Sequence, residues 1–299
     1  AAFRTAAARV DSVLRVDGGA RIVTDSSGMY REWIGVRRGR PILYQTHNRE
    51  AAASARITTL HREGNSGFNL NGSGGRIGLW DAGSPRLDHL EFGGRIIQHD
   101  PFALVHVHST HVAGTLVASG AWIEARGMAP EASIDGHDWN DDIAEMAAAA
   151  ADGLLISSHS YGQPLGWTPN IRGDGYWGWM GDPSYSLTAD LRFGFYTEDA
   201  LNWDEIAASA PDYLIVKSAG NERALEGPLD GEPNYIFDGG WRLSTDVRGR
   251  DGGESGYDTI GDAGVAKNVL TVGAVDDAPW GVQTPVDVVM TSFSSWGPV

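Results

Sequence analysis

Short apolar runs that alternate with helix-like segments constrain the fold of this chain more than any other feature. The runs at 153–162, "GLLISSHSYG", and 212–222, "DYLIVKSAGNE", begin with apolar residues and end in small and polar ones. Each run is directly preceded by a segment with the composition of a helix, the first by 141–153, "DDIAEMAAAAADG", and the second by 202–211, "NWDEIAASAP". The first begins with acidic residues and ends at a glycine, as helices commonly do. Strands that are apolar on both faces are typical of a parallel sheet covered by helices, so the sequence predicts an α/β fold.

The composition limits the classes of protein to which the chain can belong. Its 299 residues are enough for one large α/β domain or two smaller ones. A net charge of −16 repels nucleic acid, and no apolar run is long enough to cross a membrane, so neither is an expected partner. The lack of cysteine excludes disulfides, thiolate zinc sites and a cysteine nucleophile together.

These patterns divide the chain into two parts. Residues 1–50 form an N-terminal segment, in which 33–44 have the pattern of strand, turn and strand. We expect this segment to be a propeptide remnant or an accessory hairpin. Residues 51–299 form the main domain. Within it, 163–202 and 223–263 are rich in glycine with aromatic or acidic residues, and both are expected to be long loops.

Polar side chains gather where the predicted strands end. Asp81 closes one short apolar strand, and the two runs described first end in Ser160–Gly162 and Ser218–Asn221. Three histidines lie within "HVHSTHVAGT" at 106–115. Ligands bind at the carboxyl edge of open parallel sheets, so these residues make up the candidate site. On their own, the histidines suit a metal cluster, a catalytic base with bystanders, or a histidine-rich core helix.

Six segments follow one another in the chain as "IGLWDAGSP", "HSTHVAGT", "RGMAPEASI", "ISSHSYG", "IVKSAGNE" and "TSFSSWGP". In this order, with an aspartate before a histidine, they resemble the motifs of the subtilisin-like serine proteases, the subtilases of the S8 peptidase family. The resemblance covers about residues 75 to 299, and six motifs in order are far more specific than one. It implies a subtilisin-like three-layer sandwich with a mostly parallel central sheet, incomplete in this chain.

The resemblance implies the reacting groups of a serine endopeptidase, which hydrolyses peptide bonds with an Asp-His-Ser triad. His108 would be the general base, Asp81 would orient its imidazole, and the Asn221 amide would donate to the oxyanion. Ser109 stands where the family motif has glycine. The residues that would hold an extended polypeptide substrate by strand pairing are Ser160, Tyr161, Gly162, Ser218, Ala219 and Gly220.

The serine of that triad has no matching motif in this sequence. In the family it lies in a Gly-Thr-Ser-Met-Ala-like motif on a central helix that follows the "FSSWGP" segment, and this chain reaches Val299 directly after that segment. Ser294 and Ser295 lie in a strand pattern at 286–295 with no helix after it, so we expect them to be structural. We therefore expect residues 1–299 to be one piece of a longer protease, inactive alone. A complementary C-terminal fragment or chain would carry the serine.

Other functions are compatible with some of these residues. A catalytically inactive subtilisin-like fold would act as a peptide-binding or interaction module. His106, His108 and His111 could form a metallohydrolase site with "DWNDD", although "SAGNE" and "FSSWGP" would then have no role. "GSGGRIG" is similar to a dinucleotide-binding fingerprint, but its glycines precede a strand rather than open a helix. If His108 is the base, His106 is expected to be a loop or core residue and His111 a packing group.

Location and cofactors are predicted from weaker patterns. We expect the protein to be secreted or extracellular. The N-terminus does not have the pattern of a signal peptide, so the signal of an exported protein would already have been removed. The chemistry of a serine peptidase requires no cofactor. The aspartates of 223–263 (Asp230, Asp238, Asp246, Asp251 and Asp258) suit a structural Ca²⁺ site, as in many subtilases, or a loop that is simply solvated.

Overall fold

A computed structural model describes the backbone of Ile22–Thr24, Tyr30–Arg37 and Arg40–Gln45 and the residues 48–62, 64–253, 255–278 and 280–298. Its centre is a six-stranded sheet in the order β13-β10-β7-β4-β6-β5, and all neighbouring strands in it are parallel. The strands are β4 (Arg76–Asp81), β5 (Ile96–Gln98), β6 (Ser133–Asp138), β7 (Ile156–His159), β10 (Leu214–Ser218) and β13 (Leu270–Val272). The parallel sheet predicted from the apolar runs is therefore confirmed.

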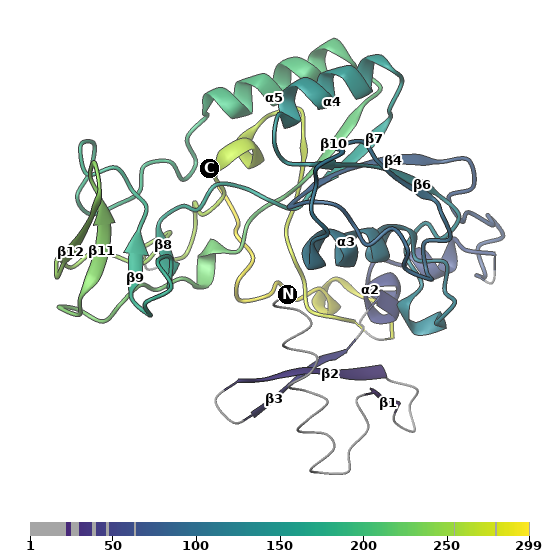
Figure 1. Cartoon of the computed structure of the whole chain (residues 1–299), viewed down its shortest axis with the longest axis horizontal. Coiled ribbons are helices and arrows are strands. Elements are labelled where there is room, and N and C mark those ends of the chain that lie inside the picture. The colour runs from purple at the N-terminus through teal and green to yellow at the C-terminus, as the bar shows by residue number, and fades with distance from the viewer. Residues whose placement is uncertain are drawn as a thin grey trace.

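Helices cover both faces of this sheet (Figure 1). α4 (Asp142–Ala151) and α5 (Glu198–Ser209) lie together over one face, and α3 (Val107–Val117) lies under the other. The core beneath α4 and α5 contains the buried side chains of Trp80, Met146, Leu154, Trp203, Ile206 and Ile215. The core above α3 contains Leu79, Phe92, Ile96, Ala113, Val117 and Ile134. Trp80 and Leu79 are adjacent in β4 and point to opposite faces, so the chain forms the three-layer sandwich that was predicted.

The register of the central strands brings three strand ends to one edge of the sheet. Trp80 of β4 pairs with His159 of β7, and Lys217 of β10 pairs with the same residue. The segments that directly follow these strands therefore leave the sheet side by side. This is the edge at which the sequence pattern placed the candidate site.

The ends of the helices follow from local residues. Thr197 caps α5, because its hydroxyl accepts a hydrogen bond from the amide of Ala200. α4 ends before Gly153, which has a φ of +84°, a left-handed conformation that glycine adopts without a steric penalty. α3 begins at Val107. Its cap residue is His106.

A second sheet forms where two long loops were expected, and this part of the prediction was wrong. It has four strands in the order β12-β11-β9-β8 and lies to one side of the sandwich in Figure 1. The strands are β8 (Trp167–Pro169), β9 (Trp177–Trp179), β11 (Asn234–Phe237) and β12 (Trp241–Ser244). Each strand has only three or four residues, and β9 pairs with β11 from the other loop. Because β9 and β11 lie in different loops, neither loop has by itself the alternation of apolar and polar residues from which a strand is predicted.

The N-terminal part of the described chain contains a small antiparallel sheet. β2 (Tyr30–Arg37) pairs with β1 (Ile22–Thr24) and with β3 (Arg40–Gln45), so the strand, turn and strand pattern at 33–44 is confirmed. Residues 1–21 lie outside the described residues. A short helix, α2 (Asn48–Ser54), follows and crosses the expected boundary at residue 50.

The expected strand at 286–295 is not formed. Only Met290 makes an isolated bridge, to Val275, and a short 3-10 helix occupies Pro285–Asp287. That helix has a Thr284–Asp287 capping box, which competes locally with an extended chain. The other 3-10 helices are η1 (Ile57–Thr59), η2 (Ile123–Ala125), η3 (Glu222–Ala224) and η4 (Asp262–Val265). No helix of the described residues is both long and apolar enough to cross a membrane.

Candidate active site

Asp81 and His108 form a hydrogen-bonded pair at the carboxyl edge of the central sheet. Asp81 is the last residue of β4 and its side chain is 1% exposed, whereas the His108 side chain, in the first turn of α3, is 48% exposed. Nδ1 of His108 lies 2.7 Å from Oδ1 and 2.9 Å from Oδ2 of Asp81. A carboxylate facing Nδ1 favours the tautomer with its proton on that atom, which leaves Nε2 as the basic nitrogen.

Backbone hydrogen bonds hold these two residues in place. The chain after Asp81 runs parallel to the chain before α3, because the Ser84 amide donates to the Leu104 carbonyl at 2.9 Å and the His106 amide donates to the Ser84 carbonyl at 2.9 Å. Nδ1 of His106 then accepts a hydrogen bond from the amide of His108 at 3.2 Å. His106 is thus an exposed loop histidine, one of the two alternatives expected for it, and it also caps the helix.

Ser109, the residue that departs from the family motif, contacts Asp81 directly. Its side chain is completely buried, and its hydroxyl donates to Oδ1 of Asp81 at 2.9 Å. The amide of Ala82 donates to the same oxygen at 2.7 Å. The carboxylate therefore has two donors besides His108, which offset its burial and fix its orientation. The serine fits without disturbing the pair.

The third histidine and the metallohydrolase alternative have no support in this geometry. His111 is exposed on α3, and within the described residues it makes no hydrogen bond to His108. Neither the three histidines nor the "DWNDD" segment forms a group of possible metal ligands in the described part of the chain. The histidine-rich stretch therefore supplies one residue that pairs with a carboxylate rather than a metal cluster.

The residues predicted to hold substrate lie around one cavity. It has a volume of about 320 Å³ and lies where β7 and β10, which are adjacent and parallel, end. Its lining includes all six predicted substrate-binding residues and the predicted oxyanion donor: Ser160, Tyr161, Gly162, Ser218, Ala219, Gly220 and Asn221. Asp81 and His108 are not part of this lining, so the pair and the cavity are neighbouring parts of one edge.

The same cavity contains charged groups that the sequence patterns did not single out. Lys217 is buried, and burial lowers the pKa of its ammonium group, which donates to the Ser218 carbonyl at 3.2 Å. Burial raises the pKa of Asp262 on the facing wall, and Lys217 counteracts part of that rise. Glu222 also lines the cavity and accepts a hydrogen bond from Ser295 at 2.8 Å. Both Ser295 and Ser294 are buried and hydrogen-bonded, in agreement with the structural role expected for them.

Behind Tyr161 lies a continuous chain of buried hydrogen bonds that was also missed. Tyr213 donates to Ser157 at 2.6 Å, and Oγ of Ser157 lies 2.7 Å from Nε2 of His159, within hydrogen-bond distance. Nδ1 of His159 lies 3.1 Å from the Tyr161 hydroxyl, which donates to Asp142 at 2.7 Å. Burial, helped by the charge of Lys217, lowers the pKa of His159 to about 3, so the ring is neutral. The signal in the sequence is the polar "SSHS" inside an otherwise apolar strand.

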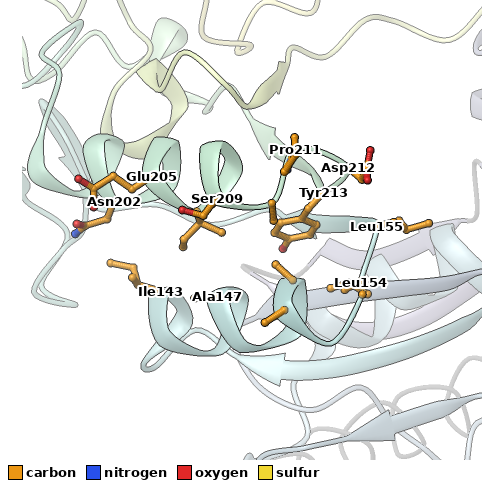
Figure 2. A pocket seen from close by; sticks show the side chains of 15 residues that line it. Ile143, Ala147, Leu154, Leu155, Asn202, Glu205, Ser209, Pro211, Asp212 and Tyr213 are labelled. Carbon is orange, nitrogen blue, oxygen red and sulfur yellow. The ribbon is translucent and has the colours of Figure 1, made fainter.

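A second hollow lies at the opposite edge of the sheet. It is a groove of about 480 Å³ between α4 and α5, lined mainly by aliphatic side chains and Tyr213 (Figure 2). Leu154, Leu155 and Tyr213 precede β7 and β10, so the groove faces the amino ends of the strands. It is therefore separate from the candidate active site.

The aspartates that suggested a calcium site do not come together. Among the described residues, no three of them form a group able to share an ion. Asp238 pairs with Arg242, and Asp246 lies 3.2 Å from Arg248. Asp251 is buried and accepts a hydrogen bond from the Trp167 amide at 2.9 Å. These three aspartates therefore make other contacts in the described structure, and a structural calcium site stays a prediction.

Comparison with known proteins supports the same class. A family model described as the subtilase family (Peptidase_S8) matches residues 97–299, and the chain belongs to this family. No curated protein matches the chain.

Several solved structures are similar at low sequence identity. A lanthipeptide protease has 15% identity and a TM-score of 0.44, with coverage of 84% of this chain and 60% of its own. The prenylagaramide maturation protease PagA has 17% identity and a TM-score of 0.40, with coverage of 75% of this chain and 58% of its own. The CspB protease of Clostridium perfringens has 15% identity and a TM-score of 0.48, with coverage of 82% and 76%. The chain thus spans less than two thirds of the first two proteins.

Proposed function

We propose that this chain provides the Asp–His half of a serine endopeptidase that cleaves polypeptide substrates. The observation that carries the proposal is the Asp81–His108 pair, whose Nδ1–carboxylate distance is 2.7 Å. In the described residues, Nε2 of His108 has no hydrogen bond. This nitrogen is the atom that must accept the proton of a serine hydroxyl.

Each of the candidate residues has its own role in the proposed peptide-bond hydrolysis. His108 takes the proton from the serine Oγ through Nε2 as that oxygen attacks the substrate carbonyl carbon, and it later returns the proton to the leaving amine. Asp81 stabilises the imidazolium formed in between. The Asn221 amide donates to the oxyanion, and losing such a donor typically costs about 3 kcal/mol of transition-state stabilisation. Residues 160–162 and 218–220 pair with an extended substrate.

The proposal places the nucleophilic serine on a complementary segment or chain outside these residues. Apolar side chains that are open to solvent beside the candidate site support it. The segment directly before His108 is one such place, with Phe102 92% and Leu104 83% exposed. The edge strand β13 is another, since Leu270 and Val272 are also exposed. Exposed large apolar side chains of this kind are typical of a site of association.

Labelling with a fluorophosphonate probe tests the proposal. The chain, isolated under native conditions with any companion fragment, is expected to give a labelled serine that lies outside residues 1–299, identified by intact mass and peptide mapping. His108→Ala should abolish labelling, because the serine then lacks its base. His111→Gln is the matched control and should label normally.

Two results would contradict it. Label on Ser294 or Ser295 would place the nucleophile inside this chain. A folded sample with no labelled species that still binds extended peptides would favour the alternative, an inactive subtilisin-like fold that acts as a peptide-binding module. A secreted location and a structural calcium ion stay predictions, and addition of CaCl₂ to chelated protein should raise the thermal midpoint if such an ion exists.

A further inference from the structure

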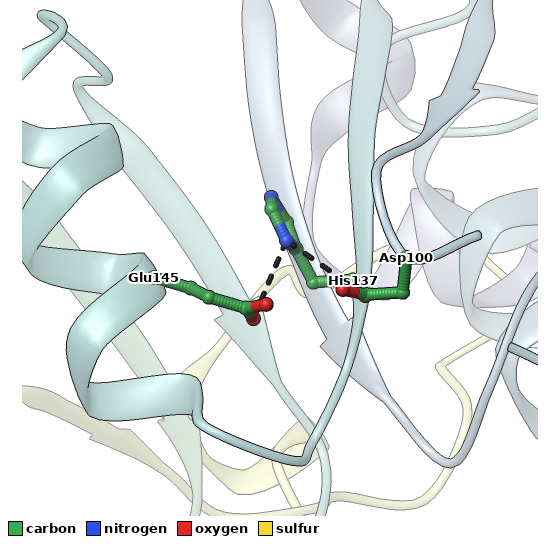
Figure 3. Close-up of side chains that lie close together, drawn as sticks. All are labelled: Asp100, His137 and Glu145. Carbon is green, nitrogen blue, oxygen red and sulfur yellow. Dashed lines mark ion pairs between the residues drawn. The ribbon is translucent and has the colours of Figure 1, made fainter. Parts of the chain in front are cut away.

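Three potential metal ligands converge outside the candidate active site. His137 is in β6, Glu145 is in α4, and Asp100 follows β5. Nδ1 of His137 lies 3.3 Å from Oε2 of Glu145 and 3.9 Å from Oδ2 of Asp100. Figure 3 shows the two carboxylates on either side of the imidazole, both linked to the same nitrogen. One ligand atom from each residue lies within 4.8 Å of the other two.

The nitrogen at the centre of this group has no hydrogen-bond partner among the residues that the structure describes. Nδ1 of His137 is a buried atom, and its contact with Glu145 lacks the direction of a hydrogen bond. The side chain as a whole is 12% exposed. A buried polar atom without a partner costs about 1–3 kcal/mol, so an atom in this position points to a missing ligand.

Two carboxyl groups from different elements face that nitrogen, Oε2 of Glu145 at 3.3 Å and Oδ2 of Asp100 at 3.9 Å. An imidazole nitrogen that carries no proton and carboxylate oxygens are both metal ligands. A cation between these three atoms would satisfy all of them at once.

Surrounding residues hold the three side chains in position. The Trp80 indole N–H donates to Oε2 of Glu145 at 3.0 Å, and the Asp138 amide donates to Oδ2 of Asp100 at 2.6 Å. The His137 ring is stacked between Trp80, with centroids 4.5 Å apart, and His99, at 4.8 Å. Fixed ligand orientation of this kind is what outer-shell contacts supply in metal sites.

We propose that Asp100, His137 and Glu145 bind one divalent transition-metal ion of the Zn²⁺ type. Two carboxylate oxygens and one imidazole nitrogen are a donor set that zinc accepts, with a fourth position left for water. Ca²⁺ prefers oxygen ligands only, so the imidazole argues against it. Ligand distances near 2.0–2.2 Å require the three side chains to approach one another. The ion would tie α4 to β6 and to the segment after β5, independently of any peptidase activity.

Calorimetric titration with ZnCl₂ tests this on the whole 299-residue chain after chelation and dialysis. The expected result is one tight site per chain and a higher thermal midpoint with zinc. Glu145→Gln and His137→Gln should each weaken binding by at least about tenfold. Asp135→Asn is the matched control. Asp135 lies in the same strand as His137, but its carboxylate pairs with Arg76 and His99 and is not one of the three proposed ligands. It should bind zinc like the unmodified chain.

Several results would overturn the proposal. These are no saturable binding, equal affinity in His137→Gln, or an equal loss in Asp135→Asn. If a glutamine variant does not fold, as judged by far-UV circular dichroism, zinc-edge X-ray absorption of the unmodified chain decides the matter. A shell with one imidazole and oxygen ligands supports the site, and a shell with no imidazole or with several contradicts it.

Discussion

At the scale of single residues, the Asp81 carboxylate organises the candidate site. It is buried, and it receives hydrogen bonds from the Ala82 amide and the Ser109 hydroxyl while it faces Nδ1 of His108. In Asp81→Asn the side-chain amide can present its N–H₂ group to Nδ1 of His108. An N–H donor at that position no longer favours the tautomer with the proton on Nδ1.

This change is measurable without any catalysis. Nitrogen-15 NMR of the His108 ring should report a single tautomer with the proton on Nδ1 in the unmodified chain. In Asp81→Asn it should report a mixture or the opposite tautomer. An unchanged ring spectrum would mean that the carboxylate does not set the tautomer.

Ser109 gives a second prediction at this scale. Removing its hydroxyl in Ser109→Ala leaves a buried charged group with one donor fewer, so the free energy of unfolding should fall by about 1.5–3 kcal/mol. Ser109→Gly, which restores the family residue, should lose about 1 kcal/mol more because glycine disfavours a helix. Urea denaturation measures both. If the alanine variant is as stable as the unmodified chain, the hydroxyl does not stabilise the carboxylate.

At the scale of elements, a buried acid from the loop after β12 contacts the first strand of the second sheet. Asp251 accepts a hydrogen bond from the amide of Trp167, the first residue of β8. Burial raises the pKa of Asp251 to about 7, with Asp190 and Glu222 as further causes. The folded-state pKa is above the unfolded value of 3.8, so the folded state favours the protonated form. This contribution to stability is complete below about pH 4 and is lost as the pH rises through about 7.

Asp251→Asn should therefore change the pH profile of stability. The amide imitates the protonated acid and keeps an oxygen for the Trp167 amide, so the loss between about pH 4 and 7 should become smaller. Chemical denaturation at pH 5 and pH 8 measures this for both proteins. A variant whose free energy of unfolding declines as steeply as that of the unmodified chain would show that another group is responsible.

The elements also show what local patterns could and could not reveal. β7 and β10 were recognisable because each lies in a run that begins with apolar residues, and β4 was recognisable because a short apolar strand ends at Asp81. β8, β9, β11 and β12 were not, since their pairing connects segments about sixty residues apart and depends on tryptophans that pack across the sheet. The strand expected at 286–295 does not form, because a local apolar pattern is not sufficient without a neighbouring strand to pair with. Its apolar residues suited a strand, but few of them found a pairing partner in the described structure.

At the scale of the whole molecule, Trp80 connects the sheet to the layer above it. Its side chain is 0% exposed, stacks on His137 and His159, and donates to Glu145 of α4. Trp80→Ala should lower the free energy of unfolding by about 3–5 kcal/mol through the cavity it leaves.

Trp280, which is 93% exposed, is the matched control for this prediction. Trp280→Ala should change the free energy of unfolding by less than about 0.5 kcal/mol. Denaturation followed by circular dichroism compares the two variants. Equal effects would mean that Trp80 does not support the core.

The sequence by itself determined the class of fold, the family and the identity of the candidate residues. Apolar runs report burial on both faces, and the motif around Asp81 and His108 is local in the chain. Only the tertiary structure decided which polar residues meet. The Ser109–Asp81 contact, the chain of hydrogen bonds behind Tyr161 and the Asp100–His137–Glu145 group join residues from different elements. The physical reason is that a hydrogen bond or a ligand set depends on distance in space, which the packing of strands and helices sets and a linear pattern does not record.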